Sequence, residues 1–291
     1  MAGYILYNGF WNAEKPSPPV LQLAAAGERL GVSLSPIKNT ELTALLTNNG
    51  SEVNGLSAGD FALVWDKDVR LCRALEACGV RLYNPAEGVA VCDDKAATHL
   101  ALARAGVPMP RTLVAPMTYR EMNLTAAEPF IKTALHTFSF PMIVKECFGS
   151  FGQQVFLAHN EEELRRLVLE RESRPFLVQE FINSSKGHDR RLYVVGDRIA
   201  AAMERRHPTD FRANIGAGGS GTAYVPTEEE AALALRCCRV LGLDFAGVDL
   251  LVSPNGPLVC EVNASAFFEE ISACTGVDMA EEIVRYVISK Q

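Results

Sequence analysis

Short apolar runs alternate with helix-like stretches through the first ninety or so residues. Apolar runs at residues 4–7, 61–65 and 80–83 predict buried strands, and residues 20–30 and 69–77 predict helices. Residues 10–19, which hold Pro16, Pro18 and Pro19, predict a loop. Strand, helix and strand joined by short connections predict a small parallel α/β unit.

The pattern changes after a helix predicted at residues 93–105, which ends at Gly106. Three predicted hairpins follow. They pair residues 142–147 with 153–158, 190–195 with 198–205, and 248–253 with 258–263. Helices in this half of the chain begin at Asn160, Thr227 and Asp278, each followed three residues later by Glu. This half of the chain therefore predicts an α+β region of hairpins and helices.

Composition narrows the class of protein. Of the 291 residues, 48% are hydrophobic, and 28 Lys and Arg against 35 Asp and Glu give a net charge of −7. That balance argues against a nucleic-acid partner bound through a basic field. No apolar run is long enough to span a membrane, and the start of the chain lacks the features of a signal peptide. None of the eight cysteines forms a Cys-x-x-Cys pair. We expect a cytoplasmic protein with reduced cysteines, no structural zinc and no membrane partner.

The last hairpin carries the strongest local signal. Pro254-Asn255-Gly256 predicts its turn, and a register that pairs Ser253 with Pro257 places Asp249 opposite Glu261. Asn263 lies two residues further on and shares a face with Glu261. Opposed carboxylates repel, so a cation is expected between them, and oxygen ligands suit Mg²⁺ or Mn²⁺. The alternatives are a solvated acidic edge or carboxylates paired with arginines.

Lys145 stands in an otherwise apolar predicted strand, just before a turn that contains Gly149, Ser150 and Gly152. A lysine buried among apolar residues needs an anion, and such a turn could cover phosphates. The alternative is a lysine at a sheet edge beside a flexible turn.

Arginines gather around the second hairpin, whose tight turn is Gly196-Asp197. This turn predicts that Asp189 and Arg191 share a face, with Glu204 and Ala202 opposite them, and Arg205, Arg206 and Arg212 follow closely. Their planar guanidinium groups suit phosphate or carboxylate, although salt bridges with local acids are the alternative. The nearby Gly216-Ala-Gly218-Gly219-Ser-Gly221 matches G-x-G-x-x-G. It lacks the strand and helix of a dinucleotide-binding turn, so a flexible glycine loop is favoured.

From Asp94 to its C-terminus the chain resembles the ATP-grasp superfamily, specifically the RimK-like carboxylate–amine ligases. The resemblance rests on IVKECFGSFGQQVFL, FLVQEFI, HDRRLYVVGDRIAAAMERR, DFRANIGAGG, LGLDFAGVDLL and PLVCEVNAS, in family order. It implies a fold with two lobes that grip ATP between mixed or antiparallel sheets. The domains expected are an N-terminal α/β domain at 1–92, a central lobe at 93–182 and a catalytic lobe at 183–291.

The resemblance also implies an acylphosphate mechanism, in which a carboxylate takes the γ-phosphate of ATP and an amine displaces phosphate. Arg191 and Arg212 would hold the transferred phosphate or the substrate carboxylate. Asp249, Glu261 and Asn263 would bind Mg²⁺ or Mn²⁺, with two ions expected. The implied nucleotide contacts are Lys95, Lys132, Lys145, Gly149, Ser150, Gly152, Gln179, Glu180, Phe181, Ile182, Asp189 and Arg212.

One segment departs from the glutamate-adding members, in which Asn-Ala-Ser is followed by Pro-Gly. Here Ser265 is followed by Ala-Phe-Phe268-Glu269-Glu270, which puts glutamate as the added amino acid in doubt. Ser265, Phe268 and Glu269 are candidate substrate contacts, although both phenylalanines could belong to the core. The carboxylate could sit on a peptide or a small metabolite, the amine is of the amino-acid type, and a homo-oligomer is possible. The alternatives are a small-molecule kinase on the same fold and a nucleotide-binding module without turnover.

Overall fold

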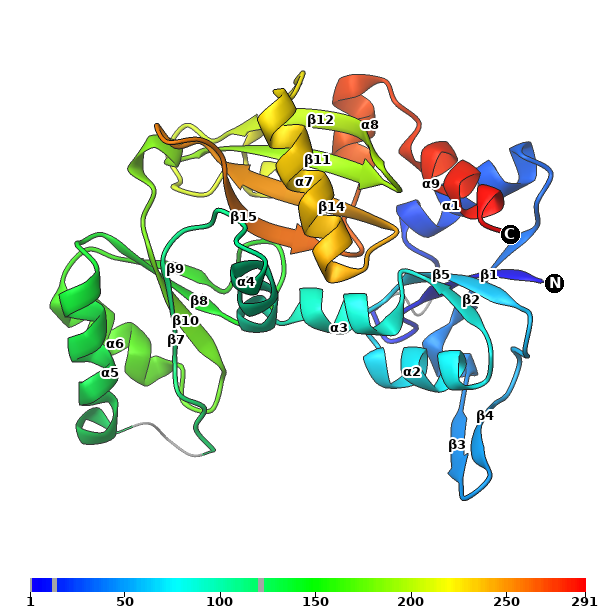
Figure 1. The fold of residues 1–291 in the computed structure, drawn as a ribbon, viewed down its shortest axis with the longest axis horizontal. Coiled ribbons are helices and arrows are strands. Elements are labelled where there is room, and N and C mark those ends of the chain that lie inside the picture. The colour runs from blue at the N-terminus through cyan, green and yellow to red at the C-terminus, as the bar shows by residue number, and fades with distance from the viewer. Residues whose placement is uncertain (1, 12–14, 120–122) are drawn as a thin grey trace.

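The computed structural model describes residues 2–11, 15–119 and 123–291. Its first sheet is parallel, with strand order β2-β1-β5-β6 (Figure 1). The strands are β1 (Gly3–Tyr7), β2 (Leu34–Lys38), β5 (Phe61–Trp65) and β6 (Arg81–Tyr83). The helices that follow β1 and β5 are α1 (Pro18–Arg29) and α2 (Val69–Ala77). The parallel N-terminal sheet predicted from the sequence is thus confirmed.

Sequence patterning missed β2 because this strand lies at the sheet edge. Its middle residues are exposed and include Pro36, so it lacks the continuous apolar run of the fully buried β5. The sequence pattern also did not predict a small antiparallel hairpin of β3 (Ala44–Thr47) and β4 (Gly50–Val53), which projects from the body of the protein (Figure 1).

The second sheet is antiparallel and has the order β7-β10-β8-β9. Its strands are β7 (Thr112–Val114), β8 (Met142–Glu146), β9 (Val155–Ala158) and β10 (Phe176–Glu180). Helices α5 (Leu124–Thr137) and α6 (Glu161–Glu170) pack on it. We call this unit the central lobe. Its buried apolar residues form a separate core, and none of the described residues in it belongs to the cores of the other two sheets.

The third sheet is also antiparallel, in the order β13-β12-β11-β14-β15. Its strands are β11 (His188–Val195), β12 (Arg198–Arg206), β13 (Ser220–Ala223), β14 (Phe245–Leu251) and β15 (Leu258–Asn263). The helices around it are α3 (Ala86–Asp93), α4 (Lys95–Arg104), α7 (Glu228–Leu241), α8 (Glu269–Thr275) and α9 (Met279–Ser289). Single 3-10 turns lie at Asn39–Glu41, Asn183–Ser185 and Ile215–Ala217.

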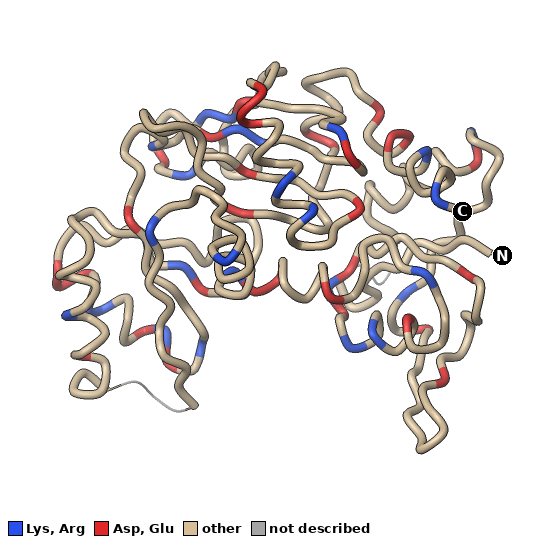
Figure 2. The backbone as a smooth tube through the Cα atoms, viewed as in Figure 1, with Lys and Arg blue, Asp and Glu red and all other residues tan. Residues whose placement is uncertain are grey.

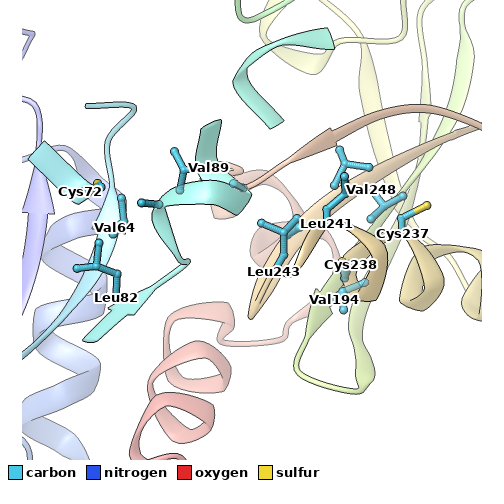
Figure 3. Packing of buried hydrophobic residues seen from close by; sticks show 14 of the residues in the cluster. Val64, Cys72, Leu82, Val89, Val194, Cys237, Cys238, Leu241, Leu243 and Val248 are labelled. Atoms are coloured by element: carbon cyan, nitrogen blue, oxygen red, sulfur yellow. The ribbon is translucent and has the colours of Figure 1, made fainter. Parts of the chain in front are cut away.

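The first and third sheets share two apolar cores. In one of them, Val64 and Leu82 of the N-terminal sheet pack in the same cluster as Val89 of α3 and Val248 of β14 (Figure 3). The central lobe therefore stands as a separate body beside a larger unit made of the two ends of the chain. Two separately packed bodies can move as units, because interiors are close-packed and resist deformation.

The register of the β14–β15 and β11–β12 hairpins only partly follows prediction. Asp249 pairs with Glu261 as expected, although an irregularity after Asp249 shifts the pairs nearer the turn by one residue. In the β11–β12 hairpin the predicted register is correct next to the turn, at Val194 and Val195, and is wrong by one residue from Tyr193 back to Asp189. A bulge between Tyr193 and Val194 places Arg205, not Glu204, opposite Asp189, and Met203, not Ala202, opposite Arg191.

Among the residues that the structure describes, no helix is long and apolar enough to cross a membrane. Figure 2 shows Lys and Arg interspersed with Asp and Glu along the described chain, which agrees with the moderate net charge.

Candidate active site

A cavity of about 960 Å³ lies where residues from all three sheets meet, a size suited to a ligand of nucleotide dimensions. Most of the predicted site residues line it. They are Lys95, Lys145, Ser150, Gly152, Gln179, Glu180, Phe181, Ile182, Asp189, Arg191, Arg212, Asp249, Glu261, Asn263, Ser265 and Glu269. Residues far apart in the sequence thus come together around one space.

Lys145 projects from β8 into this cavity and is only 7% exposed. Its Nζ lies 3.7 Å from Cys260 Sγ, a weak partner. Within the described chain, no carboxylate comes within ion-pair distance of this ammonium group, although most other cations of the cavity wall have one. A buried, uncompensated cation facing a cavity fits an anionic ligand.

The loop after β8 is tethered at three points by cations from outside the central lobe. Lys95 Nζ donates to the Gly149 carbonyl at 3.1 Å, and Lys67 Nζ donates to Ser150 Oγ at 3.2 Å. Arg212 Nη1 donates to the Gly152 carbonyl at 2.6 Å. Gly152 has a φ of +71°, a conformation that favours glycine. Gly149 belongs to this loop but does not line the cavity.

Gln179, on β10, is fixed by a buried network. Its Nε2 donates to His99 Nε2 and to Thr112 Oγ1, both at 2.8 Å, and His99 Nδ1 donates to the Lys95 carbonyl at 2.7 Å. Burial, with a contribution from the Lys145 charge, lowers the pKa of His99 to about 4, so the ring is neutral and its Nε2 accepts. Beside Gln179, Glu180 accepts from the Arg111 amide at 2.8 Å. This network joins α4 to the strand that leads into Glu180–Ile182.

Arg191 and Asp249 are cross-strand neighbours on β11 and β14, joined by two hydrogen bonds of 2.7 Å. Arg205 makes hydrogen bonds of 2.6 and 2.7 Å with Asp189 and lies 3.0 Å from Asp249. Burial alone would raise the pKa of Asp249, but Arg191 and Arg205 outweigh it and hold the pKa at about 2. Asp249 is therefore ionised. From the sequence, Arg205 was expected to recognise phosphate or carboxylate, with a salt bridge to a local acid as the alternative. The structure shows the salt bridge, because a bulge that the local pattern does not reveal brings Arg205 opposite Asp189.

The three predicted metal ligands share one wall of the cavity, and their chemistry fits Mg²⁺. Asp249 Oδ1 accepts one hydrogen bond and keeps room for another ligand. Glu261 has one oxygen 3.2 Å from Lys95, and its other oxygen has no donor among the described residues. The Asn263 side chain likewise has no hydrogen-bond partner among them. The described residues hold no group of three or more His, Cys, Asp and Glu suited to a metal, so Asn263 would have to complete the set.

Two predicted residues lie elsewhere. Lys132 sits on α5 with its side chain 73% exposed, 3.8 Å from Glu128, and does not reach the cavity. Phe268 is 1% exposed and packs against Trp65 at 5.3 Å between ring centroids, so it is a core residue, and Phe267 lines the cavity instead. Ser265 donates to the Val64 carbonyl at 3.3 Å.

The N-terminal sheet contributes a wall that the sequence analysis missed. Tyr7, Asn8, Trp65 and Asp66 follow or end β1 and β5 and line the cavity. Ligands of open parallel sheets bind at the carboxyl ends of strands, and this rule could have singled these residues out.

Comparison with known proteins places this geometry in a family. The family model for the RimK-like ATP-grasp domain matches residues 92–287. The chain belongs to the RimK-like ATP-grasp family. It is 36% identical over 220 residues to a probable alpha-L-glutamate ligase of Stenotrophomonas maltophilia (strain K279a), covering 74% of this chain and 72% of the relative.

Solved structures agree on the fold. A RimK domain ATP-grasp protein from Sphaerobacter thermophilus matches with a TM-score of 0.73 and 23% identity, covering 98% of this chain and 99% of the other. A D-alanine–D-alanine ligase from Bacillus anthracis, solved with ATP, matches with a TM-score of 0.65 and 16% identity, covering 99% and 96%. The RimK-like protein described here is an ATP-dependent ligase that joins a carboxylate to an amine.

Proposed function

We propose that this ligase first transfers the γ-phosphate of ATP to a carboxylate and then couples the acylphosphate to an amine of the amino-acid type. A carboxylate oxygen attacks the γ-phosphorus, and the bond to the β–γ bridging oxygen breaks to release ADP. The amine nitrogen then attacks the acyl carbon, the bond to the phosphate oxygen breaks, and the nitrogen's proton leaves to phosphate or water. The carboxylate belongs to a peptide or a small metabolite.

The buried ammonium group of Lys145 is the observation that carries this proposal. It faces the cavity, lacks a carboxylate partner within the described chain, and stands at the start of the loop held by Lys95 and Arg212. A triphosphate satisfies such a cation, and the amides of the glycine-containing loop can approach phosphate oxygens. Gln179, Glu180, Phe181 and Ile182 would then hold the adenosine end.

Asp249, Glu261 and Asn263 would hold two Mg²⁺ or Mn²⁺ ions. Such ions would supply positive charge that offsets the negative charge of the phosphates. Arg205 would act as a positioning residue, since it holds both Asp189 and Asp249 in place.

Arg191 and Arg212 would contact the transferred phosphate. Both line the cavity, and both are held in this structure by an acid on their own lobe, Arg191 by Asp249 and Arg212 by Asp210. These hydrogen bonds fix each guanidinium plane before a ligand arrives. Such preorganisation lowers the cost of binding the transition state.

Hydroxylamine, used as a surrogate amine, tests this proposal. Mg-ATP is incubated with a panel of carboxylates, and ADP and hydroxamate are measured for the wild type, for Glu261→Gln and for Glu162→Gln. Glu162 is exposed on α6, so its variant is a charge-matched control. We expect hydroxamate in equal amount to ADP with one carboxylate class, unchanged in Glu162→Gln and lost in Glu261→Gln. ADP with a stable phosphorylated product and no hydroxamate would indicate a kinase instead.

A further inference from the structure

The carboxyl ends of β1 and β5 form a crevice in the wall of the active-site cavity. In the strand order β2-β1-β5-β6, the chain continues from β1 to β2 on one side and from β5 to β6 on the other side. Adjacent parallel strands whose connections diverge in this way open a crevice at their carboxyl ends, where open α/β sheets bind ligands. Asn8 and Asp66 are the first residues after these two strands, and both line the cavity.

Asp66 is buried in this crevice with one oxygen unsatisfied. Its Oδ1 accepts from Asn8 Nδ2 at 3.1 Å and from the Lys67 amide at 2.7 Å. Its Oδ2 is buried and has no donor among the described residues. The ammonium group of Lys67 is directed to Asp93, 2.6 Å away, and to Ser150. A buried carboxylate oxygen without a donor is rare in native proteins and marks a place for a donor from outside the chain.

Two further acids line the same cavity. Ser265 Oγ donates to the Val64 carbonyl and Phe268 packs against Trp65, so the segment that leads into α8 is docked on the end of β5. Glu269 and Glu270, the first residues of α8, both line the cavity. In the described part of the chain, neither has an ion-pair partner. Burial raises the pKa of both Asp66 and Glu269, as expected where the protein supplies no cation to either carboxylate.

Three aromatic residues that line the cavity, Phe267, Trp11 and Phe151, lie together just before α8. Phe267 lies 6.3 Å from Trp11 and 5.8 Å from Phe151 between ring centroids. Of the cations on the cavity wall, Lys95 is paired with Glu261 and Arg191 with Asp249, and Lys145 is assigned above to the phosphates of ATP. A substrate carboxylate would therefore meet acids and rings here. An ammonium group with an apolar body would meet complementary charge and the faces of the rings.

We propose that this crevice is the amine subsite of the ligase, with Asp66 and Glu269 taking the ammonium group of the incoming amine and Trp11 and Phe267 taking its apolar body. The inference rests on the proposed function. It assigns the amine a class: an ammonium compound with an apolar side chain and no side-chain carboxylate. Glutamate, the amino acid in the relatives' printed names, does not belong to that class.

Calorimetric titration of the full chain with bound Mg-AMPPNP tests the subsite. The probes are L-phenylalaninamide, 3-phenylpropanamide, which has the same skeleton without the ammonium group, and L-glutamate. We expect L-phenylalaninamide to bind at least about tenfold more tightly than either other probe, since a hydrogen bond between charged groups is worth that much. Asp66→Asn changes only the unsatisfied atom, because the amide oxygen can keep both existing hydrogen bonds. This substitution should raise the dissociation constant for L-phenylalaninamide about tenfold or more.

Asp197→Asn removes the same charge from an exposed turn and serves as the matched control, with unchanged affinity expected. Glu269→Gln provides a second variant, and thermal melting checks that each protein is folded. Equal affinity of the wild type and both subsite variants, tighter binding of L-glutamate, or no saturable binding of L-phenylalaninamide would each overturn the inference. AMPPNP affinity is measured first. If the wild type does not bind AMPPNP, the proposed function fails; if it does, a negative amine result counts against the subsite alone.

Discussion

Arg191 on β11 and Asp249 on β14 face each other across the sheet and share two hydrogen bonds of 2.7 Å, while Arg205 approaches the same carboxylate at 3.0 Å. The pair is largely shielded from solvent, since Asp249 is only 5% exposed. The carboxylate proposed to hold a metal ion therefore also holds two arginines in position.

Asp249→Asn should destabilise the ligand-free protein as well as stop turnover. Removing one charge of a buried ion pair leaves its partners uncompensated, which costs about 3–5 kcal/mol. Urea unfolding gives the free energy of unfolding, and Mg-ATP titration gives the loss of binding. Glu282→Gln breaks an exposed pair with Arg198 and should cost less than about 1 kcal/mol. Equal effects of the two substitutions would contradict the role assigned to Asp249.

Lys145→Met should weaken nucleotide binding without lowering the free energy of unfolding. Because the ammonium group is buried without a carboxylate partner, its replacement by an apolar side chain should leave the free energy of unfolding unchanged or raise it by about 1 kcal/mol. The dissociation constant for Mg-ATP should rise by about 10- to 100-fold, the value of a charged hydrogen bond. Lys132→Met, on the exposed face of α5, is the matched control and should change neither quantity. A less stable Lys145→Met protein with normal ATP affinity would refute the phosphate assignment.

His99 should make stability depend on pH. Its pKa is lowered from 6.5 to about 4 in the folded protein, so the unfolded chain binds the proton more readily. The stability it contributes is fully present above pH 6.5 and is lost as the pH falls towards 4, at about 1.4 kcal/mol per pH unit within that window. Urea unfolding from pH 8 to pH 5 measures the slope. His99→Gln should be less stable at pH 8 yet show a smaller slope, and identical slopes would contradict a buried neutral imidazole.

Gly152→Ala should impair the phosphate loop. At a φ of +71° an alanine is strained by about 1–2 kcal/mol, and its Cβ would lie 3.3 Å from Arg212 Cδ and Asn214 Oδ1. We expect a higher KM for ATP and a free energy of unfolding that falls by no more than this strain, about 1–2 kcal/mol. Gly216→Ala is the control, because Gly216 has no positive φ and open space where the Cβ would stand. A KM that rises equally in both variants would point to general loop sensitivity instead.

Much of the site could be predicted because its residues sit on hairpins with clear signals. The register predicted from the turn at Pro254-Asn255-Gly256 is wrong by one residue next to the turn. The predicted pairing of Asp249 with Glu261 is nevertheless correct, because an irregularity between the turn and this pair compensates for the difference. Lys145 stood out because it was a cation in an apolar strand. The likeness to a known family supplied the roles that spacing alone could not.

What remained hidden depends on tertiary structure. The bulge at Tyr193 and Val194 moves Arg205 opposite Asp189, and nothing in the local sequence signals it. Strand β2 was missed because an edge strand with an exposed proline carries no apolar run. Phe267 and Phe268 are adjacent and chemically identical, so only the fold reveals which one faces the cavity. Asp66 was overlooked because strand order, and not local pattern, brings it to the site.

Oxygen labelling tests the central claim, the acylphosphate intermediate, most directly. The carboxylate found with hydroxylamine is prepared with ¹⁸O in both oxygens and turned over with Mg-ATP and an accepted amine. The released phosphate is then examined by mass spectrometry. The account predicts one ¹⁸O in each phosphate and none in ADP, because a carboxylate oxygen becomes bonded to the γ-phosphorus and leaves with it. Phosphate without label, alongside the amide product, would contradict it.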